Sequence, residues 1–179
     1  MNFSGKIFLI LGPMFSGKTT ELLRKYERYQ LAQRKCIFIK YNKDNRYENG
    51  QITHNGLKVN AFPYDKLADS DNIVQGYDIV CIDEIQFYPD APEYCDKWAN
   101  EGKIVVACGL NGKFDRTQWD VISDLIPLVE DITYLTAICL DNGNQATYSK
   151  RLTDDTRAEV VGGKDMYQAV DRETYFKTT

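Results

Sequence analysis

One short motif, Gly12-Pro13-Met14-Phe15-Ser16-Gly17-Lys18-Thr19, constrains the fold of this chain more than any other segment. It has the pattern G-x-x-x-x-G-K-T and follows an apolar run at 7–11 that is typical of a buried strand. In this pattern backbone N–H groups surround a phosphate, the lysine reaches the terminal phosphates, and the threonine hydroxyl can hold Mg²⁺. The motif therefore predicts a strand, a phosphate-binding loop (P-loop) and a helix that together bind a nucleoside triphosphate. A glycine turn with an exposed lysine is the alternative, but it does not need these residue types at this spacing.

The size and charge of the chain exclude several classes of protein. Its 179 residues suit one core of ordinary size with a small appended lobe. The 22 Lys and Arg against 26 Asp and Glu give a net charge of −4, so we expect no nucleic-acid partner. No signal peptide precedes the first strand, and no apolar run approaches the ~20 residues that span a membrane. We therefore expect a soluble, cytoplasmic protein that does not bind membranes.

Strand and helix signals alternate along most of the chain. Further strands are predicted at 36–41, 77–82, 103–108 and 131–140, and helices after the P-loop and at 65–74, 89–100 and 119–128. A short hairpin is expected around Asn55-Gly56. Buried strands joined by helices imply parallel, right-handed crossovers. We predict an α/β fold, a RecA-like P-loop domain with a doubly wound, mostly parallel sheet at 1–138, followed by a small loop-rich lobe at 139–179.

Two adjacent carboxylates, Asp83 and Glu84, follow the third predicted strand directly. Such groups are costly to place at the end of a buried strand, and this edge of an open α/β sheet is where ligands bind. On a still-extended backbone the two side chains would point to opposite sides. We expect Asp83 to hold Mg²⁺, partly through water, and Glu84 to face the acceptor of a phosphoryl group. Water as the acceptor would make an ATPase, and a solvated strand-end glutamate is the remaining alternative.

Later loops contain further candidates. Asp44 and Arg46 in the polar stretch 42–49 can approach a phosphate or its metal, with solvated surface as an equal alternative. Several aromatic residues could stack on a flat heterocycle, although each singly is more often part of a core. They are Phe87, Tyr88, Phe114, Trp119 and Tyr167.

In these residues the chain resembles the type II thymidine kinases, the cellular and poxvirus-like deoxythymidine kinases. The matching stretches keep the same order along nearly the whole chain. They are 11–22, 39–41 with Asp44 and Arg46-Tyr47, Ile82-Asp83-Glu84-x-Gln86-Phe87, Leu110-x-Gly112-x-Phe114, 135–139, 148–151, and Gly162-Gly163 with Tyr167.

The resemblance implies transfer of the γ-phosphate of ATP to the 5′-hydroxyl of deoxythymidine, a step of nucleotide salvage for DNA synthesis. Glu84 is then the general base, and Asp44, Arg46, Asp83 and Gln86 join the P-loop on the ATP side. Residues expected to enclose thymine and the sugar are Met14, Phe87, Leu110, Phe114, Trp119 and Ser149, with Ala158, Glu159, Val160, Val161, Gly162 and Tyr167 of a lasso-like loop. Trp119 stands where relatives usually have Phe. Relatives are commonly homotetramers, which we extend to this chain as an expectation.

One departure from the family concerns zinc. Relatives usually hold Zn²⁺ in the small lobe with two C-x-x-C pairs, whereas the corresponding positions here are Cys139, Asn142, Asp171 and Thr174. The five cysteines of the chain form no such pair. A lone thiolate with an amide, a carboxylate and a hydroxyl is a poor tetrahedral zinc site. We therefore predict no structural zinc, and a lasso that is looser when the substrate is absent.

Two rival functions remain open. Nucleoside monophosphate kinases usually bring several arginines to the second phosphate, but Arg151 and Arg157 are the only arginines between Thr117 and Val170. A nucleotide-gated binding protein with slow ATPase activity is the rival from another class. Thymidine-dependent release of ADP would favour the kinase over this switch.

Overall fold

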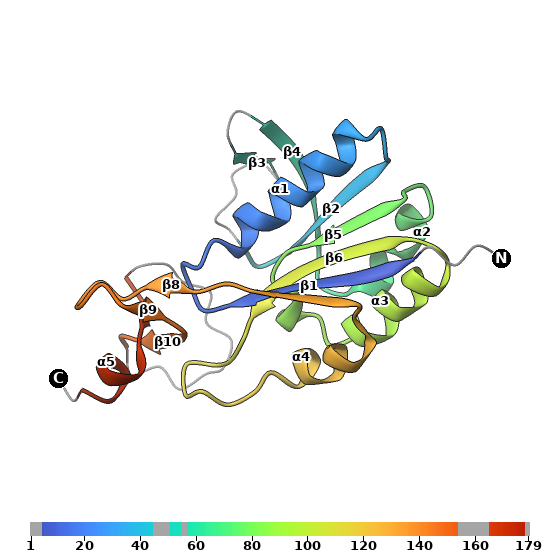
Figure 1. The fold of residues 1–179 in the computed structure, drawn as a ribbon. Helices are drawn as coiled ribbons and strands as arrows, with labels where there is room; N and C mark the ends of the chain where they lie inside the picture. The colour runs from blue at the N-terminus through green and yellow to red at the C-terminus, as the bar shows by residue number, and fades with distance from the viewer. Residues whose placement is uncertain (1–4, 45–50, 55–56, 154–164, 178–179) are drawn as a thin grey trace.

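Seven strands form one central sheet, in the order β3-β4-β2-β5-β6-β1-β7 (Figure 1). The computed structural model describes residues 5–44, 51–54, 57–153 and 165–177. Neighbouring strands run parallel throughout, except that β3 and β4 at one edge are antiparallel. The predicted α/β architecture is therefore confirmed. The strands are β1 (Lys6–Gly12), β2 (Cys36–Tyr41), β3 (Gln51–His54), β4 (Leu57–Tyr64), β5 (Ile79–Ile82), β6 (Ile104–Leu110) and β7 (Asp131–Tyr134).

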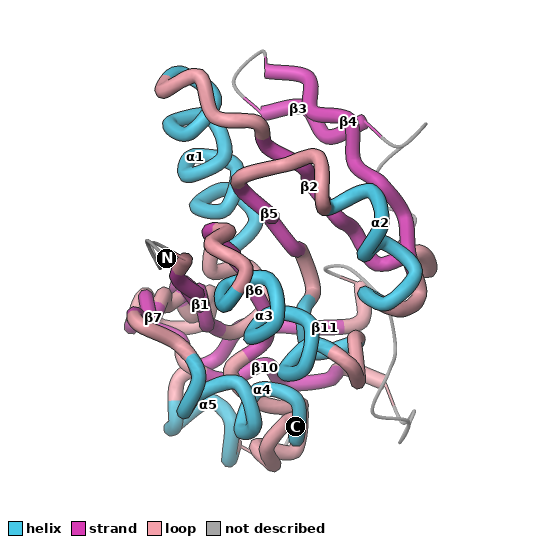
Figure 2. The backbone as a smooth tube through the Cα atoms, turned by 90° about the vertical axis from the view of Figure 1, so that its right-hand side faces the viewer, coloured by secondary structure: helices cyan, strands magenta, loops and turns pink. Residues whose placement is uncertain are grey.

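Helices cover both faces of this sheet, which explains the nearly continuous apolar strands. Along β1, Leu9 and Leu11 face a core shared with α3 (Ala91–Asn100) and α4 (Asp120–Leu125). Ile10 points the other way, into a core shared with α1 (Lys18–Leu31). Figure 2 shows α1 and α2 (Asp71–Val74) on opposite sides of β2 and β5. The result is a three-layer arrangement with the sheet in the middle.

Three predicted elements are divided in the structure. The helix expected at 65–74 is a 3₁₀ helix (Leu67–Ser70) followed by α2, and the helix expected at 119–128 is α4 followed by a 3₁₀ helix (Ile126–Leu128). The strand expected at 131–140 is interrupted after β7. Strand β7 pairs with Phe8 to Leu11 of β1, and β1 ends at Gly12. The chain therefore has no further partner in the sheet and leaves it.

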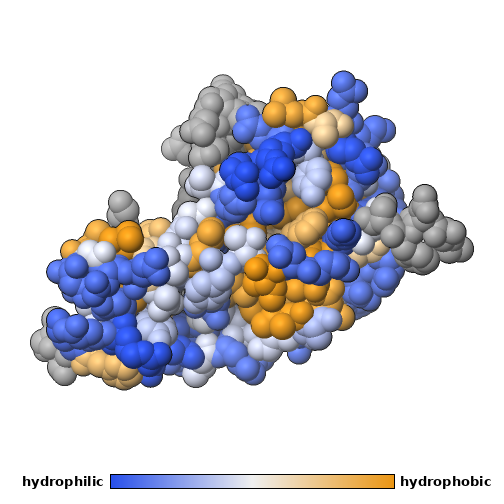
Figure 3. Space-filling model, in the orientation of Figure 1, coloured by the Kyte–Doolittle hydropathy of each residue, from blue (hydrophilic) through white to orange (hydrophobic). Residues whose placement is uncertain are grey.

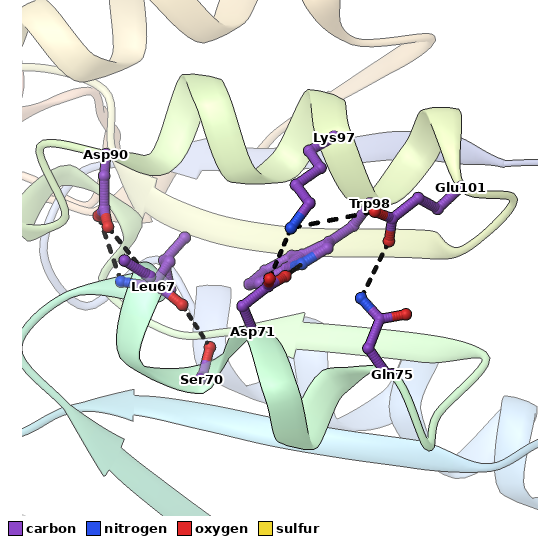
Figure 4. A network of polar contacts seen from close by, with 9 residues as sticks. Leu67, Ser70, Asp71, Gln75, Asp90, Lys97, Trp98 and Glu101 are labelled. Atoms are coloured by element: carbon purple, nitrogen blue, oxygen red, sulfur yellow. Dashed lines mark hydrogen bonds and ion pairs between the residues drawn. The ribbon is translucent and has the colours of Figure 1, made fainter.

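A polar network fixes α3 against α2 and the 3₁₀ helix that precedes it (Figure 4). Asp71 accepts hydrogen bonds from Trp98 Nε1 at 2.8 Å and from Lys97 Nζ at 2.5 Å. These two bonds lower the pKa of the Asp71 carboxyl, with the Lys97 bond as the larger cause. Asp90 accepts from the backbone N–H groups of Leu67 and Ala68 at 3.2 and 2.9 Å. All of these hydrogen bonds join helices on one face of the sheet. We therefore assign the network to the stability of the fold.

The remaining elements form what we call the C-terminal lobe, β8 to α5. It contains two short antiparallel pairs of strands and one helix. β8 (Ala137–Ile138) pairs with β9 (Gln145–Ala146), β10 (Tyr148–Arg151) pairs with β11 (Tyr167–Val170), and α5 (Arg172–Phe176) follows. Figure 1 shows this lobe beside the end of β1 from which the P-loop starts. The lobe has a small hydrophobic core of its own, which includes Cys139, Ala146 and Val170. Of the lasso-like loop expected at 158–167, residues 158–164 lie outside the described residues.

The surface of the lobe is partly apolar. Ile138 and Leu140 of the lobe are exposed. Figure 3 shows that most of the lobe surface on this face is hydrophilic, with small apolar areas. Among the described residues, no helix is both long and apolar enough to cross a bilayer.

Candidate active site

The P-loop joins β1 to α1 and is closed by its own hydrogen bonds. Ser16 Oγ and Lys18 Nζ both donate to the Pro13 carbonyl oxygen, at 2.9 and 2.8 Å. Phe15 and Gly17 have φ values of 63° and 81°, in the left-handed region that turns the backbone sharply. Gly12 is required for close approach, because a Cβ there would lie 2.5 Å from the Leu135 carbonyl oxygen. The loop therefore has the curled backbone and inward lysine that a phosphate cradle needs.

Thr19 and Asp83 lie side by side in the site. Thr19 is at the start of α1, and Asp83 directly follows β5. Thr19 Oγ1 donates to the Asp83 carboxylate, at 3.1 and 3.2 Å from its two oxygens. Only 1% of Asp83 is exposed. A hydroxyl and a carboxylate are the hard oxygen ligands that Mg²⁺ prefers. This pair lies where the sequence predicts the metal.

Two further donors hold the Asp83 carboxylate. Glu84 N donates to Asp83 Oδ1 at 3.1 Å, and Cys108 Sγ donates to the same oxygen at 2.9 Å. Burial, followed by the neighbouring Asp83 carboxylate, raises the pKa of the Cys108 thiol, so the thiol stays protonated as a donor. Sequence reasoning missed Cys108, because a cysteine inside an apolar strand carries no signal of such a contact.

Glu84 does not continue the extended backbone that the sequence analysis assumes. Its φ of 55° and ψ of 46° are left-handed, and a 3₁₀ helix (Ile85–Phe87) follows at once. Such a conformation is costly for a residue with a Cβ and concentrates at functional sites. The Glu84 carboxylate, which is half-buried, accepts a hydrogen bond from Gln86 Nε2 at 2.7 Å. The chain therefore turns sharply directly after Asp83.

Four of the aromatic side chains that the sequence offers for stacking lie in two groups. Phe87 packs edge-on against Trp119, with ring centroids 5.6 Å apart, and contacts Tyr41 at 5.0 Å. In the second group the Arg151 guanidinium lies 3.9 Å above the Phe114 ring and donates to Tyr167 Oη at 2.7 Å. Each group joins residues far apart in sequence.

Tyr88 belongs to neither group. It is fully buried and packs edge-on against Tyr41, so it is part of the core. The interpretation of Tyr88 as a possible stacking residue is therefore wrong.

Besides Arg151, the C-terminal lobe contacts the site through hydrogen bonds of Ser149 and Tyr175. Ser149 Oγ of β10 accepts a hydrogen bond from Met14 N of the P-loop at 2.9 Å. Tyr175 Oη of α5 donates to the Phe114 carbonyl oxygen at 2.8 Å. Sequence reasoning proposed Met14, Ser149 and Phe114, but it could not show that the lobe holds all three.

The other predicted residues divide into described and undescribed ones. Asp44 is buried at the end of β2, and its carbonyl oxygen accepts from Lys40 Nζ at 2.9 Å. Leu110 ends β6 at the same edge of the sheet as Gly12 and Asp83. Outside the described residues lie Arg46, Ala158, Glu159, Val160, Val161 and Gly162.

An apolar cavity of about 420 Å³ lies between the P-loop and the lobe. Phe15 borders it on one side, and Ile138, Leu140 and Leu152 border it on the other. Its lining suits a flat or apolar group. Sequence reasoning did not find it, because its walls come from four separate stretches of the chain.

The four positions at which relatives carry zinc ligands meet in space and are joined by hydrogen bonds. Cys139 Sγ donates to Thr174 Oγ1 at 3.5 Å, and Asn142 Nδ2 donates to Asp171 Oδ2 at 2.8 Å. Asp171 also accepts from Asn144 Nδ2 and from Thr174 N, and so caps α5. These bonds, first that from Asn144, hold the pKa of the Asp171 carboxyl far below its usual range. In the described part of the chain no three His, Cys, Asp or Glu residues are grouped to hold one metal ion.

Comparison with known proteins identifies the fold and the family of this chain. A solved structure, the flagellar accessory protein FlaH of Methanocaldococcus jannaschii, shares the fold with a TM-score of 0.54 at 10% identity, covering 79% of this chain and 75% of that one. The thymidine kinases of variola, vaccinia (strain Ankara) and monkeypox viruses are each 48% identical over 171 residues, covering 96% of this chain and 97% of theirs. The sequence model of the family described as thymidine kinase matches residues 5–175. This chain therefore belongs to the thymidine kinase family.

Proposed function

We propose that this protein transfers the γ-phosphoryl group of ATP to the 5′-hydroxyl of deoxythymidine, giving deoxythymidine monophosphate and ADP. The observation that carries the proposal is the carboxylate of Glu84, placed by a left-handed turn directly after the Thr19–Asp83 pair. Phosphoryl transfer to an alcohol needs three parts: a phosphate cradle, side chains that bind the metal ion, and a separate carboxylate.

On the donor side the P-loop binds the triphosphate. Its backbone N–H groups and Lys18 hold the β- and γ-phosphates. Asp44 and Arg46 also serve the nucleotide, as the family resemblance implies. Thr19 and Asp83 fit Mg²⁺, because a hydroxyl and a buried carboxylate lie 3.1 Å apart at the mouth of the loop. When bound, the metal neutralises charge on the transferring phosphoryl group.

On the acceptor side Glu84 orients the nucleoside and receives a proton. The 5′-oxygen forms a bond to the γ-phosphorus, while the bond from that phosphorus to the oxygen bridging the β-phosphate breaks. The proton of the 5′-hydroxyl passes to the Glu84 carboxylate, and ADP leaves with the bridging oxygen. General-base help of this kind typically contributes ~10²–10⁴ in rate.

The nucleoside lies against the aromatic wall and the C-terminal lobe. Phe87 and Trp119 supply one stacking group, and Phe114 with Tyr167 supplies the other. Met14, Leu110 and Ser149 complete the wall, together with Ala158, Glu159, Val160, Val161 and Gly162 of the lasso-like segment.

Further expectations about domains, localisation, oligomeric state and zinc accompany this function. The kinase domain extends over 1–138, with the small lobe at 139–179. The protein acts in the cytoplasm as a homotetramer, without structural zinc. The hydrogen bonds around Asp171 support the last point, because its carboxylate oxygens already have three donors. Stoichiometric zinc in purified, tag-free protein would contradict it.

A coupled assay of ADP release across a panel of nucleosides tests the proposed function. The panel contains deoxythymidine, deoxyuridine, deoxycytidine, the two purine deoxynucleosides and deoxythymidine monophosphate. We expect release of ADP that depends on deoxythymidine. Turnover without any nucleoside would favour the ATP-driven switch, and turnover with the monophosphate alone would favour a nucleoside monophosphate kinase.

A further inference from the structure

The side-chain amide of Gln86 bridges the reacting carboxylate and the neighbouring strand. Its Nε2 donates to Glu84 Oε2 at 2.7 Å, and its Oε1 accepts from Leu110 N at 3.1 Å. Gln86 is 3% exposed, so water does not replace these bonds cheaply. The resemblance assigns Gln86 to the nucleotide, whereas both bonds run to other parts of the site.

The chemistry of the two partners requires an amide at this position. A backbone N–H can only donate and a carboxylate can only accept, so the bridging group must accept at one end and donate at the other. Glutamine has both functions on one planar group. Glutamate would present a second acceptor to Glu84, and methionine, of similar length, would satisfy neither partner.

The surroundings hold this amide in one position. A Cβ at Gly109 would lie 2.6 Å from Gln86 Oε1, so the strand backbone at Gly109 packs directly against the amide. Gly109 precedes Leu110, the last residue of β6, and the loop that follows carries Phe114. The amide therefore connects Glu84 to the segment that borders the nucleoside.

We infer that Gln86 is a positioning residue, which fixes the Glu84 carboxylate relative to β6 and so sets its distance from the 5′-hydroxyl. This inference rests on the proposed function. Misplacement of a reacting group by about 1 Å can cost ~10²-fold in rate. Because Glu84 is already in a left-handed conformation, a second restraint on its side chain completes its placement.

Two variants of Gln86 test this role. Gln86→Met removes both hydrogen bonds, and Gln86→Glu keeps the bond from Leu110 N but turns an acceptor toward Glu84. We expect kcat with deoxythymidine to fall about 10- to 100-fold in both variants. The dissociation constant of ADP, measured by calorimetry, should change by less than about twofold, because Gln86 does not hold the nucleotide. If Gln86→Met fails to fold, Gln86→Glu still tests the role. This variant should fold, because the Leu110 N–H keeps an acceptor.

Gly109→Ala perturbs the same amide from the other side. Its new Cβ would lie 2.6 Å from Gln86 Oε1 and 2.7 Å from Ile85 Cγ2. It would displace both side chains while leaving Glu84 and Gln86 chemically intact, so we expect a fall in kcat of similar size. Gln75→Met is the matched control, because Gln75 is exposed and its amide contacts Glu101 and Asp71 of the polar network between α2 and α3, away from Glu84. We expect the control to have the kcat of the wild-type protein.

The outcomes separate this inference from the function on which it rests. A wild-type kinase whose kcat is unchanged in both Gln86 variants would contradict the positioning role alone. An equal loss of ADP affinity and kcat would also contradict it, by showing that Gln86 contacts the nucleotide. A wild-type protein with no nucleoside-dependent release of ADP would contradict the proposed function, and the inference with it.

Discussion

The thiol of Cys108 donates a hydrogen bond to the carboxylate of Asp83, with 2.9 Å between Sγ and Oδ1. Both residues are fully or almost fully buried, and they come from neighbouring strands, β6 and β5. A cysteine of an apolar strand thus supports the carboxylate proposed to hold the metal.

Removal of this donor should destabilise the protein. Cys108→Ala leaves a buried carboxylate oxygen with one donor fewer, which costs about 1–3 kcal/mol in free energy of unfolding. Cys108→Ser keeps a hydroxyl donor and should cost less. Urea unfolding of both variants measures the difference. Equal stability of the Ala and Ser variants would show that the thiol hydrogen bond contributes nothing.

Tyr88→Phe should raise the free energy of unfolding. Tyr88 is fully buried, and its hydroxyl has no hydrogen-bond partner within the described structure. An unsatisfied buried hydroxyl costs about 1–3 kcal/mol, and its removal leaves the ring packing against Tyr41 unchanged. Thermal and urea unfolding check this, with Tyr94→Phe as a control near the surface. A loss of stability in Tyr88→Phe would mean that the hydroxyl is satisfied in solution.

Acidification should weaken the C-terminal lobe through Asp171. Its hydrogen bonds depress the folded-state pKa, so the ionised carboxylate stabilises the lobe above ~pH 4, its ordinary unfolded pKa. This contribution decreases as the pH falls from there toward the folded pKa. Asp171→Asn should therefore be less stable than the wild-type protein at pH 7, and the difference should shrink below ~pH 4.

Hydrogen exchange of the lobe amides between pH 3 and 7 measures this dependence. Asp124→Asn, an exposed substitution on α4, is the control. A difference between Asp171→Asn and wild type that stays constant across this range would contradict a titrating role for Asp171.

Tyr175→Phe should weaken the binding of deoxythymidine without affecting ATP. The substitution removes the hydroxyl that holds the Phe114 carbonyl oxygen, while the ring stays against Arg116, 4.8 Å from its guanidinium. Loss of one hydrogen bond of about 0.5–1.5 kcal/mol predicts a rise in KM for deoxythymidine of about two- to tenfold. Steady-state kinetics with each substrate varied in turn measures the effect. An equal rise in KM for ATP would show a general loss of structure instead.

Prediction from the sequence succeeds where a local pattern carries the information. The P-loop motif predicts the turn from β1 to α1, and apolar runs ending in Gly12 and Asp83 predict strands whose ends meet at one edge. Thr19 and Asp83 follow from the same patterns, because parallel strands bring their carboxyl ends together.

The sequence does not predict features that depend on tertiary contacts. Nothing local indicates that Glu84 is left-handed, that Gln86 bridges the Glu84 carboxylate and the Leu110 N–H, or that Tyr88 lies in the core. The break after Tyr134 depends on where β1 ends, and the loss of the zinc cysteines does not reveal that Asp171 gathers hydrogen bonds in their place.

The most direct test of the central claim, that Glu84 accepts the proton of the nucleoside 5′-hydroxyl, is the turnover of Glu84→Gln. The substitution keeps the shape of the side chain and its reach, but removes the basic carboxylate. We predict that kcat with deoxythymidine falls about 10²–10⁴-fold. The affinity for ADP, measured by calorimetry on the same sample, should stay within about twofold of the wild-type value. A Glu84→Gln protein that turns over deoxythymidine at the wild-type rate would contradict the account.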